Sequence, residues 1–126
     1  MERRDFLNCT VLTTLAAGTG VAQAAGQTTA KPAQPTKGVR ITVLKHAVQA
    51  DFQKYRGAAI KPCTVVQDGQ QFTAEQPWNK PQGMCDWAWA DIRVDLPFLF
   101  AGQWEQTVAC CSDGFRPVFF RLERLT

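Results

Sequence analysis

The sequence predicts an α+β fold: a small single domain with a mainly antiparallel sheet of about five short strands, which could close as a barrel, and two helices. Three observations support this prediction. Short runs of β-branched and aromatic residues recur along the chain, Asp-Gly turn signals stand at 68–69 and 113–114, and two other segments carry apolar residues at helical spacing.

The first half of the domain is expected to form a strand, a helix and a hairpin. The strand covers 40–45, a run rich in β-branched residues. The helix covers 47–56, whose apolar residues recur at helical spacing: Val48, Phe52 and Tyr55. The hairpin pairs 63–66 with 71–73 around the first Asp-Gly turn, and prolines and a glycine then predict a loop over 77–83.

The second half is expected to form a helix and another hairpin. The helix covers 85–95, with Asp86 placed to cap its first turn. Pro97 should stop or kink this helix unless it starts a second turn. The hairpin pairs 107–111 with 117–125 around the second Asp-Gly turn. Two sets of apolar residues should face the core: Cys85, Trp89 and Ile92 on the helix, and Val118, Phe120 and Leu122 on the last strand.

The N-terminus is typical of an export signal. Residues 1–24 combine a paired arginine, an interrupted apolar stretch and a small-x-small cleavage pattern, and they resemble a twin-arginine leader. An ordinary secretory signal shares most of these features. Either route predicts a periplasmic or otherwise exported protein, and the first makes the twin-arginine export machinery a partner. The stretch is too short and too polar to predict a permanent membrane anchor. The residues of this signal are Arg3, Arg4, Phe6 and Leu7, with cleavage expected between Ala24 and Ala25.

A flexible linker is expected over 25–38, because this stretch contains prolines and threonines but no large apolar side chain. The folded domain then covers 39–126. The chain has 14 basic and 11 acidic residues, a formal net charge of +3. Its basic residues form no run, so nothing in the sequence predicts binding to nucleic acid.

Two segments resemble those of a known family. Residues 83–92 read Gly-Met-Cys-Asp-Trp-Ala-Trp-Ala-Asp-Ile, and residues 110–120 read Cys-Cys-Ser-Asp-Gly-Phe-Arg-Pro-Val-Phe-Phe. In these segments the chain is similar to a family of small, uncharacterised bacterial and archaeal proteins with Cys-Asp-Trp-Ala-Trp-Ala-Asp and Cys-Cys-x-Asp-Gly-x-Arg-Pro-Val signatures. The resemblance covers essentially the whole domain and implies no activity. The export leader and Pro97 depart from the family pattern.

Removal of the leader leaves four cysteines: Cys63, Cys85, Cys110 and Cys111. An exported protein favours disulfides, but adjacent cysteines on a strand point to opposite faces, so we expect at most one easy bridge, from Cys63 or Cys85 to one of the pair. A second interpretation is a zinc or iron site in which three of these thiolates converge, with His46, water or substrate in the fourth position. A third is that the thiols are buried and inert.

His46 is the single histidine and thus the one side chain that ordinarily titrates near neutral pH. Beside a thiolate at Cys63 or Cys85 it would be the general base of a small enzyme. The alternative is an ordinary surface histidine.

The polar residues of the two signature segments give another candidate site. Asp91 and Arg116 could bind a small polar ligand, with Trp87 lining the pocket. The alternative is structural: Asp86 caps the helix, Asp113 makes a turn, and Arg116 pairs with Asp91 to hold the helix to the hairpin.

These observations predict no specific activity. We expect an exported small binding or accessory module whose cysteine cluster could hold a metal or a redox disulfide. The alternatives are a small enzyme with a thiolate nucleophile and a disulfide-stapled interaction domain. Neither the partner protein nor the small ligand is predicted.

Overall fold

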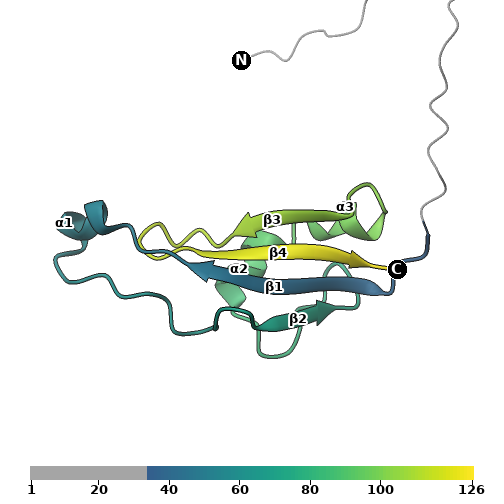
Figure 1. The fold of residues 1–126 in the computed structure, drawn as a ribbon, viewed down its shortest axis with the longest axis horizontal. Coiled ribbons are helices and arrows are strands. Elements are labelled where there is room, and N and C mark those ends of the chain that lie inside the picture. The colour runs from purple at the N-terminus through teal and green to yellow at the C-terminus, as the bar shows by residue number, and fades with distance from the viewer. Residues whose placement is uncertain (1–33) are drawn as a thin grey trace, which may run out of the picture.

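The protein folds as a four-stranded antiparallel sheet with short helices on one face, as Figure 1 shows for the computed structural model. The structure describes residues 34–126, so the predicted signal over 1–24 and the first part of the predicted linker lie outside the described residues. The strands are β1 (Gly38–His46), β2 (Gln71–Ala74), β3 (Gln106–Cys110) and β4 (Val118–Leu125), in the spatial order β2-β1-β4-β3.

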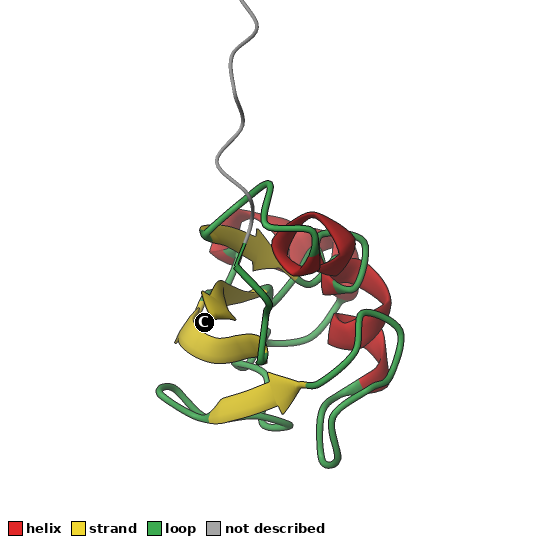
Figure 2. Cartoon of the chain, turned by 90° about the vertical axis from the view of Figure 1, so that its right-hand side faces the viewer, coloured by secondary structure: helices red, strands yellow, loops and turns green. Residues whose placement is uncertain are grey.

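The helices occupy two places. Helices α2 (Asp86–Ile92) and α3 (Leu96–Phe100) lie on one side of the sheet, as Figure 2 shows edge-on. The 3-10 helix η1 (Ala50–Phe52) and the short helix α1 (Gln53–Arg56) lie beyond one end of it (Figure 1). No helix in the described part of the chain is long and apolar enough to cross a membrane.

The predicted α+β class and antiparallel sheet are confirmed, but the strand count and the barrel are wrong. The described residues form four strands in an open sheet, with β2 and β3 at its edges. The reason lies in the first predicted hairpin, because 63–66 is a loop and β2 pairs with β1 instead. The Asp-Gly turn lies directly before β2 and also contacts β1, because Gly69 N–H donates to the Val43 carbonyl at 2.8 Å.

A β-bulge at Leu44 changes the register between β1 and β4. Val43 stands opposite Phe120, whereas Lys45 and His46 stand opposite Phe119 and Val118. Leu44 is thus the extra residue on β1. His46 consequently lies on the same face as the buried Val118, and Lys45 lies on the other face, 5.3 Å from the Phe119 ring centroid.

The core fills the space between one face of the sheet and helices α2 and α3. From the sheet it takes alternate residues of β1, β2 and β4, which agrees with the predicted inward face of β4, while Ala109 of β3 is partly buried against it. From the helices it takes side chains at helical spacing. The fully or nearly fully buried members include Val39, Ile41, Val43, Trp89, Ile92, Leu96, Leu99, Phe120 and Leu122.

The predicted helix over 47–56 is wrong in length. Helical structure begins at Ala50, and the three apolar residues at helical spacing, Val48, Phe52 and Tyr55, are 37%, 46% and 72% exposed. The segment projects past the end of the sheet (Figure 1), and none of these three side chains joins the buried core cluster. Two backbone hydrogen bonds attach the start of the segment to the β3–β4 loop. Ala47 N–H donates to the Pro117 carbonyl and Gln49 N–H to the Phe115 carbonyl, each at 2.9 Å.

The second predicted helix is present but shorter. Helix α2 ends at Ile92, and Cys85 rather than Asp86 is its N-cap residue, with no side-chain capping bond. Pro97 starts a separate turn, because its fixed φ suits the first turn of α3. The hairpin of β3 and β4 is confirmed. At the N-terminal boundary β1 begins at Gly38, and the preceding residues contact the domain: Arg124 donates to Thr36 Oγ1 at 2.7 Å.

Candidate functional site

The two signature segments meet at Ser112. Asp91 Oδ2 accepts a hydrogen bond from the Ser112 backbone N–H at 2.6 Å, and Trp87 Nε1 donates to Ser112 Oγ at 2.9 Å. Trp87 and Asp91 are four residues apart on α2 and therefore lie on one side of the helix. This contact, which we name the Ser112 clasp, attaches α2 to the loop between β3 and β4.

The ion pair predicted between Asp91 and Arg116 is not formed. Arg116 Nε instead donates to Asp113 Oδ2 at 3.0 Å, and the backbone N–H groups of Phe115 and Arg116 donate to Asp113 Oδ1. Partial burial raises the pKa of Asp113, but the hydrogen bonds from Arg116 and Phe115 and the Arg116 charge outweigh it and lower the pKa below its usual value. Asp113 therefore acts within its own turn, as predicted, and holds Arg116 there.

Trp87 is 62% exposed and does not belong to the buried core cluster. Asp86 pairs with Lys80 across the loop that precedes α2. The sequence-selected polar residues Trp87, Asp91 and Arg116 thus serve two separate contacts, the Ser112 clasp and the Asp113 turn, and do not share a ligand pocket in the described structure.

The four cysteines of the described segment are all free thiols. Cys63 and Cys85 are partly buried and pack against the core. Cys110 and Cys111 differ as the strand geometry predicts: Cys110 is exposed, whereas Cys111 is buried and its Sγ accepts the Val118 N–H at 3.3 Å. Within residues 34–126 no three His, Cys, Asp or Glu side chains are grouped to hold a metal ion. The site predicted for zinc or iron is therefore not assembled there.

His46 bonds to Asp68 rather than to a thiol. Its Nδ1 lies 2.5 Å from Asp68 Oδ1, while its Nε2 is buried without a hydrogen-bond partner among the described residues. A general base must reach the proton that it removes. With one nitrogen held by a carboxylate and the other enclosed, the ring offers no free nitrogen to a substrate in this conformation.

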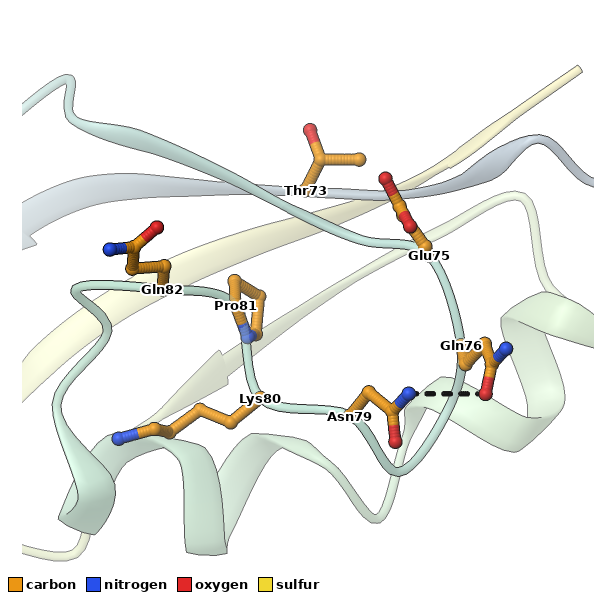
Figure 3. A pocket seen from close by; sticks show the side chains of 7 residues that line it. All are labelled: Thr73, Glu75, Gln76, Asn79, Lys80, Pro81 and Gln82. Carbon is orange, nitrogen blue, oxygen red and sulfur yellow. Dashed lines mark hydrogen bonds between the residues drawn. The ribbon is translucent and has the colours of Figure 1, made fainter.

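A polar cleft lies between the outer part of β2 and the loop that leads to α2. It encloses about 250 Å³ and is shown in Figure 3. Its lining contains one hydroxyl, one carboxylate, three amides, one ammonium and one proline ring, from Thr73, Glu75, Gln76, Asn79, Lys80, Pro81 and Gln82. The sequence marked this stretch only as a loop, and three amide side chains within seven residues were the available signal for a binding site.

Two ionisable side chains line the cleft, Lys80 and Glu75. Lys80 is paired with Asp86, so its ammonium is compensated. Asn79 Nδ2 donates to Gln76 Oε1 at 3.2 Å, which orders two of the amides (Figure 3). Glu75 has no ion pair with another residue of the described segment. What the cleft presents is therefore mainly amide and hydroxyl groups, with one acceptor carboxylate.

Comparison of the chain with protein-family models, with curated proteins and with solved structures gave no match.

Proposed function

We propose that the protein is an exported binding module whose cleft between Thr73 and Gln82 takes a small, uncharged ligand rich in hydroxyl groups, such as a monosaccharide or another polyol. The observation that carries the proposal is the chemistry of the lining, in which three amides and a hydroxyl accompany one carboxylate that has no ion pair within residues 34–126. That the protein is exported, and that it resembles the small uncharacterised family, are expectations from its sequence.

Amides and hydroxyl groups both donate and accept hydrogen bonds, and so do the hydroxyl groups of a polyol. Glu75 can accept from such a ligand but offers no donor when ionised. An anionic ligand would meet the Glu75 charge, while the Lys80 ammonium is already occupied by Asp86. The neighbouring Trp78 is 64% exposed and supplies an apolar ring in the same loop. These features together favour a neutral, hydroxyl-rich ligand over a phosphate or a carboxylate.

The thiol-based alternatives have less support from the described residues. A zinc or iron module needs convergent ligands, and a thiolate enzyme needs a base next to its thiol. The four thiols are spread between a loop, a helix start and the end of β3, and His46 is bound to Asp68. We therefore favour a binding module over a thiolate enzyme.

The test is an NMR titration of the full chain with a panel of neutral monosaccharides and linear polyols at millimolar concentrations. We expect shifts in the amide signals of 73–82 for at least one compound. Gln76→Ala should abolish these shifts, whereas Gln103→Ala, which removes an exposed amide outside the cleft, should leave them unchanged. No response to any neutral polyol, or a response that survives Gln76→Ala, would contradict the proposal.

A further inference from the structure

The end of β1 and the segment that follows it beyond the sheet concentrate the positive charge of the domain. Residues 45–61, which we name the basic tip, contain four cations, Lys45, Lys54, Arg56 and Lys61, and one anion, Asp51, a net +3. The rest of residues 34–126 contains seven cations and eight anions, a net −1. The positive field of the described chain therefore comes from one end of the molecule (Figure 1).

The basic tip also exposes apolar and aromatic side chains. Val48, Phe52 and Tyr55 are exposed in this segment, and the rings of Phe52 and Tyr55 lie 6.3 Å apart between centroids. These side chains are not required by the core, because none of them belongs to the buried cluster. An apolar patch that the fold leaves outside its own core is typical of an interaction surface.

Two cations of the basic tip lie over aromatic rings. Lys54 Nζ lies 5.0 Å from the Tyr55 ring centroid, and Arg56 Cζ lies 5.6 Å from that of Phe115 on the β3–β4 loop. The long side chains of these cations can keep contact with the rings while their charged ends reach toward an anion.

We propose that the basic tip binds reversibly to the surface of an anionic phospholipid bilayer. Aromatic rings favour the boundary between headgroups and acyl chains, and lysine and arginine beside them favour anionic headgroups. The four-residue α1 and its apolar neighbours are too short to span a bilayer, so the contact is peripheral. Charge complementarity selects an anionic membrane, and the exposed rings favour a bilayer over a purely ionic partner such as nucleic acid.

The test is co-sedimentation of the full chain with vesicles of phosphatidylcholine alone and of phosphatidylcholine mixed with phosphatidylglycerol. We expect binding to the anionic vesicles that weakens as salt rises, because the screening length shortens. Lys54→Glu with Arg56→Glu should weaken this binding at least about thirtyfold, since each cation near an anionic surface contributes roughly fivefold. Phe52→Ala with Tyr55→Ala should weaken it by at least about tenfold through the lost apolar contact.

A matched control separates the basic tip from net charge. Lys37→Glu with Arg93→Glu changes the total charge by the same amount at exposed positions outside the tip, so binding should change far less. Amide hydrogen exchange of 47–57 should slow when anionic vesicles are added, a local readout that contacts made by the N-terminal segment cannot imitate. Equal losses in both double variants, unchanged exchange in 47–57, or binding to single-stranded DNA with none to anionic vesicles would each overturn the proposal.

Discussion

Asp91 and Ser112 lie on different elements and are joined by a hydrogen bond of 2.6 Å from the Ser112 backbone N–H to the Asp91 carboxylate. Asp91→Ala removes the acceptor and leaves that N–H without its partner in the clasp. We expect a loss of about 1 kcal/mol in the free energy of unfolding, the usual contribution of such a bond at a partly exposed site. Chemical denaturation measures this loss.

The control for Asp91 is Asp86, which is on the same helix and is paired with Lys80 at the surface, with its side chain 89% exposed. Asp86→Ala should change the free energy of unfolding by less than about 0.5 kcal/mol. Losses of equal size in the two variants would show that the Ser112 clasp adds no stability.

The four free thiols should differ in reactivity. Cys110 is exposed and should alkylate first, whereas Cys111 is buried and bonded to the Val118 N–H and should alkylate last. Timed alkylation followed by peptide mapping measures the order, and Cys110→Ser should remove the fast label. A native disulfide between any two of these cysteines, found by intact mass before alkylation, would contradict the arrangement.

Asp113 should make stability depend on acidic pH. Its pKa is lowered in the folded protein, so the ionised form stabilises the fold above the pKa of the unfolded chain, and this contribution is lost as the pH falls through the folded pKa. Asp113→Asn should therefore cost about 1 kcal/mol at neutral pH and progressively less in acid. Thermal unfolding across the acidic range measures the difference.

Asp95 should make stability depend on pH in the opposite direction to Asp113. Partial burial raises the pKa of its carboxyl, so ionisation destabilises the fold as the pH rises through the folded pKa. Asp95→Asn should stabilise the protein at neutral pH, by less than about 1 kcal/mol because solvent still screens the group, and should lose that effect in acid. The same pH trend in both variants would rule out these local explanations.

Gly38 should resist substitution at the start of β1. Its φ is +139°, and a Cβ added there would lie 2.9 Å from the Ala74 carbonyl oxygen. Gly38→Ala should cost about 1 to 3 kcal/mol through backbone strain and this contact. Gly114→Ala is the matched control, because beyond its two chain neighbours no residue lies within 4 Å of its added Cβ. A Tm that falls equally in both variants would contradict the argument.

Local signals predicted the hairpin of β3 and β4 correctly, because its Asp-Gly turn lies between strands that pair with each other. The same signal at Asp68-Gly69 gave a wrong prediction. This turn precedes β2, which pairs with the more distant β1 and not with the residues just before the turn. A turn motif does not specify which strand the following segment will pair with. For this reason the sequence predicted a fifth strand at 63–66.

The candidate site was predicted only in part for a similar reason. Asp91 and Arg116 were singled out in the sequence as a pair, but Arg116 binds Asp113, three residues away, and Asp91 accepts from Ser112. A nearby partner needs less chain ordering than a remote one. The polar cleft depends on how 75–82 folds back toward β2, which no periodicity in the sequence encodes.

The extra residue at Leu44 bears on how much the length of this chain can vary. If Leu44 were paired in regular register and formed no bulge, Lys45 would stand opposite Val118 and its ammonium would point toward the apolar interior. Deleting Leu44, by contrast, would leave Lys45 opposite Phe119 and His46 opposite Val118, each on its present face. The sheet can therefore accommodate a chain one residue shorter at this position with the same inward and outward pattern, so homologous sequences aligned through β1 should be allowed a gap there.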